Sequence, residues 1–151
     1  MRTIIGWEDT MEICLRPIGK VVNDVDKESE KVDWSRVVST LEIDPGLEEG
    51  LEGIEEFARI MVIFWFHLAE ETRLKVHPRG DPSRPLRGVF STRAPVRPNR
   101  IGVTVVELIR REGNKLVVKG LDAYNGTPIL DIKPYFPENE SGDRPPWVRG
   151  G

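Results

Sequence analysis

The sequence has few of the residues that cross-link a chain, bind a metal or cross a membrane. Its one cysteine, Cys14, excludes an internal disulfide and a cysteine-based zinc site, and we expect it to fill core space. The two histidines, His67 and His77, lack a metal-binding spacing, so no metal site is predicted. No apolar run approaches the roughly 20 residues that span a bilayer, and acids interrupt the N-terminal apolar stretch. We therefore expect a cytoplasmic protein without a membrane span.

Signatures of the common nucleotide-binding and hydrolytic folds are also missing. No G-x-G-x-x-G follows a strand-like segment, and neither a Walker lysine loop nor a G-x-S-x-G elbow is found. Cys14 is a poor candidate nucleophile because Ile13 and Leu15 flank it and no histidine lies near it in the sequence. Dinucleotide-binding, nucleoside-triphosphate-binding and serine-hydrolase functions therefore have no support.

Length and composition are those of one globular domain. The 151 residues are 38% hydrophobic and 31% charged, and they contain no internal repeat. We predict a single domain over residues 1–151, in which 138–151 form a loose tail that adds little to the core apart from Trp147.

The charge distribution is uneven. Residues 79–100 contain six arginines and one acid, Asp81, and so carry +5, while the whole chain carries −3 and the remainder therefore −8. A basic segment on an acidic protein indicates a local site for a polyanion.

Most of the predicted elements are short strands. An acidic loop is expected at 23–33, and a short helix begins at Asp44-Pro45 and ends before residue 59. The apolar run 59–66 is expected to be buried on both faces. Val37, Leu41 and Ile43 are expected to face one side of their strand. Turn residues at 112–114 and 125–126 separate the last strands, and the predicted strands are 11–22, 34–43, 59–66, 87–91, 101–111, 115–122 and 127–133.

This order of elements predicts a mainly β fold. Five to seven short strands, one short helix and no βαβ alternation favour a small closed or nearly closed β-barrel. Prolines throughout 76–100 forbid long regular structure there, so this segment is expected to be a Pro/Arg-rich loop excursion from the barrel.

Two long motifs carry a family resemblance. GVFSTRAPVRPNRIG at 88–102 and GLDAYNGTPILDIKPYFP at 120–137 resemble the paired motifs of the TrmO (TsaA-like) family, and the similarity covers 45–137. The sequence departs from the family pattern at Arg100, where proline is common, and at Asn125, where aspartate is common.

The resemblance implies a homodimeric β-barrel that binds S-adenosylmethionine without a Rossmann sheet. It further implies N6-methylation of the threonylcarbamoyl adenosine beside the anticodon of certain tRNAs. The implied partners are therefore a tRNA anticodon stem-loop and a second copy of the chain.

The resemblance also implies site residues. Arg93 would pair with the methionine carboxylate, and the cofactor contacts would be His67, Leu68, Arg93, Val103, Leu121, Asp122, Ala123, Tyr124 and Asn125. The basic segment would contact RNA through Arg79, Arg84, Arg87, Arg97 and Arg100.

Catalytic candidates are His67, Asp122 and Asp131, and the residues do not decide among them. Asp131 is equally consistent with a structural buried acid, and each arginine at 79, 84 or 87 with a solvated loop charge. Two other functions stay open: a non-catalytic barrel that binds RNA or an adenosyl ligand, and a methyltransferase with a different acceptor.

Overall fold

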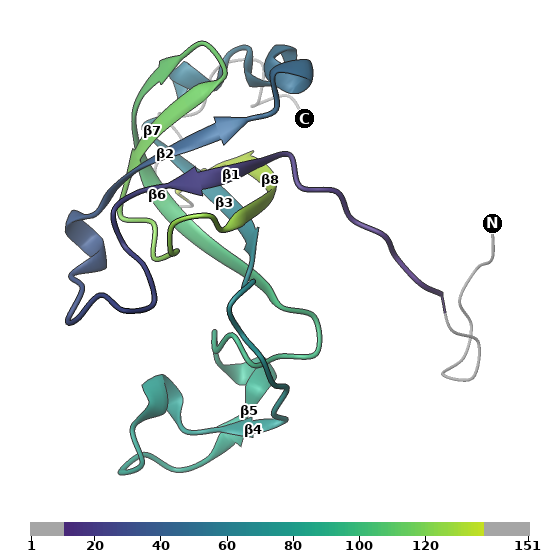
Figure 1. Cartoon of the computed structure of the whole chain (residues 1–151), viewed down its shortest axis with the longest axis vertical. Helices are drawn as coiled ribbons and strands as arrows, with labels where there is room; N and C mark the ends of the chain where they lie inside the picture. Colours follow the sequence, from purple (N-terminus) through teal and green to yellow (C-terminus); the bar gives the residue numbers. More distant parts are fainter. Residues whose placement is uncertain (1–10, 138–151) are drawn as a thin grey trace.

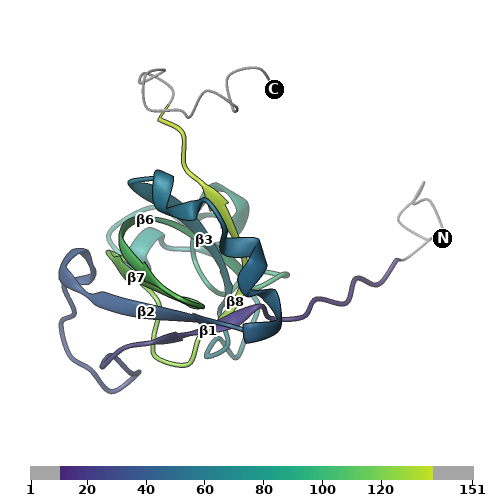
Figure 2. The ribbon, with the colours of Figure 1, turned by 90° about the horizontal axis from the view of Figure 1, so that it is seen from above.

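The computed structural model describes residues 11–137, in which six antiparallel strands close into a barrel (Figures 1 and 2). The order around the barrel is β1-β2-β7-β6-β3-β8, and β8 pairs with β1. The predicted mainly β barrel is confirmed. The strands are β1 (Gly19–Val22), β2 (Val38–Ile43), β3 (Arg59–Trp65), β6 (Ile101–Glu112), β7 (Lys115–Lys119) and β8 (Pro128–Pro134).

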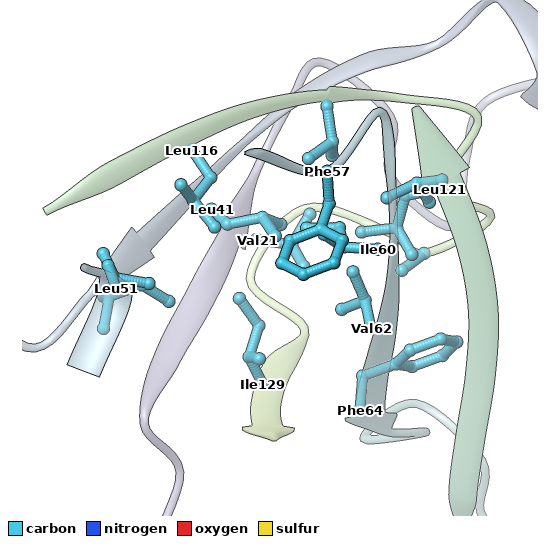
Figure 3. Close-up of a cluster of buried hydrophobic side chains, with 14 residues drawn as sticks. Val21, Leu41, Leu51, Phe57, Ile60, Val62, Phe64, Leu116, Leu121 and Ile129 are labelled. Carbon is cyan, nitrogen blue, oxygen red and sulfur yellow. The ribbon is translucent and has the colours of Figure 1, made fainter. Parts of the chain in front are cut away.

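The barrel interior is filled by the inward-facing side chains of each strand (Figure 3). On β3 the buried residues are Ile60, Val62 and Phe64, and the residues between them are half-buried. The expectation that this strand is buried on both faces was wrong, because successive side chains point to opposite faces and only one face of a barrel strand meets the core.

The hairpin of β6 and β7 is the element that matches its prediction most closely. Gly113 takes a left-handed conformation (φ 60°) in the turn, as the glycine there predicted. The second strand stops at Lys119 rather than at 122, because Gly120 also has a positive φ of 94° and turns the chain.

The first predicted strand is shorter than expected. β1 begins at Gly19, and the exposed residues 11–17 run away from the barrel (Figure 1). Ile18 already packs against the core, and its N–H donates to the carbonyl of Ile129 at 2.7 Å. Pro17 has no N–H to donate to a ladder, and a side chain at Gly19 would collide with the carbonyl oxygen of Glu42. Cys14 lies on this arm and is exposed, so the expectation that it fills core space was wrong.

The segment 34–43 divides into a 3₁₀ turn, η1 (Trp34–Arg36), and β2. Ser39, Leu41 and Ile43 are the inward-facing residues of β2. Val37, which was predicted to share a face with Leu41 and Ile43, immediately precedes the strand, where it is extended and half-buried.

The predicted short helix consists of two 3₁₀ segments, η2 (Pro45–Leu51) and η3 (Ile54–Glu56). Asp44 caps η2, since its Oδ1 accepts a hydrogen bond from the N–H of Gly46 at 2.9 Å. Gly53 separates the two segments with a φ of 88°.

The Pro/Arg-rich excursion lies between β3 and β6, beneath the barrel in Figure 1. It holds η4 (Pro78–Gly80), η5 (Val89–Ser91) and a two-stranded sheet of β4 (Lys75–Val76) and β5 (Arg87–Gly88). The strand predicted at 87–91 is thus only two residues long, and β4 was not predicted. No helix within residues 11–137 is long and apolar enough to cross a membrane. Trp147 lies outside the described residues.

Candidate functional site

A pocket opens where β3 ends and the chain enters the excursion. We call it the β3-end pocket. Its apolar wall includes Phe64, Phe66, Leu68 and Ala123, and the empty space, mouth included, is about 590 Å³. The cavity proper is about 190 Å³, smaller than the roughly 300–1,000 Å³ usual for small-molecule sites, so a larger ligand would extend into the open mouth.

A glycine makes room for the aromatic wall of this pocket. The rings of Phe64 and Phe66 meet edge to face with centroids 5.2 Å apart. On the adjacent strand, a Cβ at Gly102 would lie 2.7 Å from Cζ of Phe66 and 2.8 Å from the Phe64 ring. Gly102 is the last residue of the motif 88–102, so this motif glycine has a packing role behind the pocket.

The turn 121–127 also lines the pocket, through Asp122, Ala123, Tyr124 and Thr127. The N–H and Oγ1 of Thr127 donate to the carbonyl oxygen of Tyr124 at 3.1 and 2.6 Å. Asn125 is engaged elsewhere: its Oδ1 accepts from the N–H of Asn23 at 3.1 Å, and its own N–H donates to the carbonyl of Val25 at 2.7 Å. A carboxylate could accept the same bond, so the departure from aspartate at 125 preserves the acceptor that the turn uses.

The ionisable side chains that line the pocket include His67, Asp122 and Lys27. Partial burial lowers the pKa of His67, because the surroundings disfavour its charged form. The imidazole is therefore neutral at neutral pH. Asp122 is oriented by Thr104, whose hydroxyl donates to Oδ1 at 2.5 Å.

A second, wider hollow adjoins the pocket on the excursion side. We call it the arginine hollow: Arg79, Arg84, Arg87 and Arg93 line it together with Trp34. It shares Pro95 and Asp122 with the β3-end pocket, so the two sites are neighbours. Arg84 is partly neutralised by Asp81 at 3.6 Å.

The structure brings together five of the predicted cofactor-contacting residues. These five all line the β3-end pocket: His67, Leu68, Asp122, Ala123 and Tyr124. Arg93 lines the neighbouring hollow instead.

The other predicted cofactor contacts lie elsewhere within this protomer. Leu121 is fully buried in the barrel core, so its side chain does not line the pocket, and a cofactor contact through its backbone stays a prediction. Val103 lies on the outer face of β6, opposite Ile63 of β3.

Asp131 is separated from the other catalytic candidates. It borders a different groove beside η2, and its carboxylate pairs with Lys133 at 2.9 Å. The structure therefore does not bring Asp131 together with His67 and Asp122, and its half-exposed side chain also corrects the alternative of a buried acid.

Two of the predicted RNA-contacting arginines, Arg97 and Arg100, do not line the arginine hollow. Arg97 folds back on its own loop, where Nη1 donates to the carbonyls of Thr92 and Ala94, both at 3.0 Å. Arg100 contributes its carbonyl oxygen, which accepts from the N–H of Phe66 at 2.8 Å. An RNA contact by either residue stays a prediction.

Among the site residues that sequence reasoning missed are Lys27, Thr104 and Trp34. Lys27 belongs to a loop predicted only to be exposed, and Trp34 was assigned to a strand. Thr104 lies in a strand whose composition gave no sign of an acid partner. All three residues come to the site only when the barrel closes, and no local sequence pattern predicts which distant segments then meet.

Fold and site together define a small antiparallel barrel domain with an apolar ligand pocket beside a cationic hollow. No group of three or more His, Cys, Asp or Glu side chains that could hold a metal occurs within residues 11–137. The family described as the tRNA-methyltransferase O N-terminal domain matches residues 24–141, and the chain belongs to this family. The predicted TrmO (TsaA-like) resemblance is confirmed.

Curated relatives and solved structures agree with this assignment. A probable S-adenosyl-L-methionine-binding protein of Methanothermobacter thermautotrophicus is 44% identical over 134 residues, which cover 87% of this chain and 96% of the relative. Another from Pyrococcus abyssi is 44% identical over 131 residues, 83% of this chain and 70% of the relative. Both are named for the cofactor predicted from the sequence.

The crystal structure of TrmO from Pseudomonas aeruginosa is similar to this chain with a TM-score of 0.67 and 34% identity. The match covers 87% of this chain and 59% of the solved chain. This chain therefore spans less than two thirds of the length of that protein.

Proposed function

We propose that this protein is an S-adenosylmethionine-dependent tRNA methyltransferase that modifies N6 of threonylcarbamoyl adenosine beside the anticodon. The observation that carries the proposal is the adjacency of the two hollows. The β3-end pocket and the arginine hollow share Pro95 and Asp122, so a small ligand and a polyanion can be held side by side. Family membership supports a tRNA methyltransferase, and the names of the relatives support S-adenosylmethionine as the cofactor.

The residues of the pocket fit the cofactor. S-adenosylmethionine supplies a methyl group on a positively charged sulfur. Phe64, Phe66 and Leu68 offer apolar surface for an adenine ring, and the Asp122 carboxylate suits a neighbouring positive charge. Lys27 in the pocket and Arg93 in the adjoining hollow are two cations that can pair with a carboxylate.

The protein's own residues would assist methyl transfer by positioning the two reactants and by removing a proton from N6. Holding two reactants in contact supplies a large part of the acceleration of such reactions. His67 and Asp122 both line the pocket and can accept the proton that N6 must lose. His67 is suited to this because its lowered pKa leaves the ring unprotonated at neutral pH. The arginine hollow would hold the RNA phosphates.

We further propose that the protein acts as a homodimer. Ile101, Val103 and Val105 are each between 36% and 39% exposed along the outer face of β6. Their neighbours on β3 are Trp65, Ile63 and Met61, so the outward row is apolar on both strands. Such a continuous apolar face is typical of an interface. In a dimer, Val103 would reach a cofactor only in the partner's pocket.

Calorimetric titration with S-adenosylmethionine in the presence of a chelator tests the cofactor site. We expect saturable binding, and Arg93→Ala and Lys27→Ala each test one possible carboxylate partner. The variant that removes the true partner should weaken binding by about 1.5–3 kcal/mol. Lys133→Ala, which removes a cation paired with Asp131 away from the pocket, should leave the affinity unchanged. Absence of binding at millimolar ligand would contradict the proposal.

A further inference from the structure

Trp34 stands at the boundary between the two hollows, and neither the predicted site nor the proposed reaction uses it. It lines the arginine hollow, and its ring meets that of Tyr124, which lines the β3-end pocket. The centroids are 5.3 Å apart and the planes are inclined by 73°. The aromatic pair therefore places one ring in each hollow.

The turn that carries Trp34 is fixed in place. Asp33 caps η1, and its Oδ1 accepts from the N–H of Ser35 at 3.2 Å and from its hydroxyl at 2.6 Å. The turn ends at Val37, whose carbonyl accepts from the N–H of Gly120 at 3.0 Å. That bond ties Trp34 to the chain that leads into Asp122, so the ring is held relative to both hollows.

The geometry of the pair leaves ring surface for a ligand. In an edge-to-face contact, one ring has neither face covered by its partner and the other has one face covered. In either arrangement at least one face of Trp34 is left uncovered by Tyr124, and the side chain is only half-buried. An uncovered indole face in a hollow is a surface on which a planar group can stack.

The charges around Trp34 indicate which kind of planar group would stack on it. Within residues 11–137, Arg79, Arg87 and Arg93 line the same hollow and have no acid within ion-pair distance, whereas Arg84 has Asp81. An aromatic platform among arginines is the arrangement by which proteins bind single-stranded nucleic acid, in which bases stack and phosphates meet cations. Unpaired loop bases are the ones free to be turned out onto such a platform.

We propose that Trp34 is a stacking platform for an unpaired base of a single-stranded RNA loop whose phosphates lie in the arginine hollow. The proposal rests on the proposed tRNA function and names the residue that receives a base of the acceptor. Trp34 thereby orients the RNA, while His67 and Asp122 line the β3-end pocket together with Tyr124.

Binding of an unmodified anticodon stem-loop, followed by fluorescence anisotropy of dye-labelled RNA, tests this role. Trp34→Ala should weaken RNA affinity by about 5- to 140-fold, the loss expected for one stacked base. The factor should be the same at low and high salt, because stacking releases no counterions, whereas Arg87→Ala should flatten the salt dependence. Trp34→Phe keeps an aromatic face and should retain most of the affinity.

Fluorine NMR on protein labelled with 5-fluorotryptophan provides an independent readout. The Trp34 resonance, assigned by its loss in Trp34→Phe, should move when the stem-loop is added. Wild-type affinity in Trp34→Ala, an unmoved Trp34 resonance at saturating RNA, or no RNA binding by the wild type would each overturn the proposal. A loss of S-adenosylhomocysteine affinity as large as that for RNA would also overturn it, since Trp34 would then only support the Tyr124 side of the pocket.

Failure of the proposed function gives a different result. RNA binding that depends on Trp34, together with no methyl transfer to any tRNA, would sustain the platform and reject the methyltransferase.

Discussion

At the scale of single residues, Gly102 links a sequence motif to the shape of the pocket. It sits on β6 against the rings of Phe64 and Phe66, at distances that leave no space for a Cβ. Phe66 and Phe64 both line the β3-end pocket, so pressure on these rings is transmitted to the ligand site.

Gly102→Ala should therefore lower the free energy of unfolding by about 1–3 kcal/mol, the usual cost of overpacking. Urea denaturation measures this value. Gly50→Ala is the matched control, because nothing lies within 4 Å of a Cβ at that position and its φ is not positive. Equal stability of the two variants would show that the phenylalanine rings yield without cost.

His67 gives the pocket a dependence on pH. Burial lowers its pKa below the ordinary value, so the ring is neutral at neutral pH and becomes a cation only as the pH falls through that lowered pKa. A cationic ring would repel the positive sulfur of S-adenosylmethionine but not the uncharged sulfur of S-adenosylhomocysteine.

The ratio of the two affinities should therefore shift a few-fold toward S-adenosylhomocysteine as the pH falls through the lowered pKa of His67, a modest effect because the side chain is largely solvated. Calorimetry with both ligands across pH measures the ratio, and His67→Gln should abolish its change. A ratio that stays constant with pH in the wild type would place the sulfur away from His67.

At the scale of elements, the loop at 92–97 positions Arg93 through Arg97. The Arg97 guanidinium bridges the carbonyls of Thr92 and Ala94, which flank Arg93 on both sides. Because this link is internal, Arg97 acts on the arginine hollow by shaping the loop.

Arg97→Ala should lower the free energy of local opening by about 1–3 kcal/mol, the loss expected for hydrogen bonds to a charged donor. Hydrogen exchange should then be faster at the amides of Thr92 and Ala94, while global unfolding by urea changes little. Arg100→Ala is the control, since the hydrogen bond it makes to Phe66 uses the backbone carbonyl and survives the substitution. Unchanged hydrogen exchange at these amides in Arg97→Ala would show that Arg97 does not hold the loop in place.

Some of these elements could be predicted from the sequence and others could not. The β6–β7 hairpin was predictable because its apolar pattern and its turn glycine lie close together in the sequence. The family was predictable because the two motifs at 88–102 and 120–137 are long enough to identify it. The departure of the arm at 11–17 was not predictable, because apolar residues such as Ile13 and Leu15 resemble those of a strand, whereas they are exposed. Lys27 and Trp34 reach the site only through pairing of β1 and β2 with strands distant in sequence.

At the scale of the whole molecule, the apolar outer face of β6 predicts a dimer. Light scattering should give about twice the chain mass of 17.2 kDa. Val105→Lys should shift the protein to the monomer, because burying an unpaired ammonium in an interface is unfavourable. Val22→Lys is the matched control: this residue is also 37% exposed but lies on β1. A wild-type monomer at micromolar concentration would contradict the proposal.

The central claim is that the two adjoining hollows bring a methyl donor and a modified tRNA base together. The most direct measurement incubates the protein with methyl-labelled S-adenosylmethionine and two matched tRNAs, one with threonylcarbamoyl adenosine beside the anticodon and one with plain adenosine there. We predict incorporation of label only into the modified tRNA. Equal labelling of both would show that the carbamoyl group is not recognised, and labelling of neither would contradict the assignment as a tRNA methyltransferase.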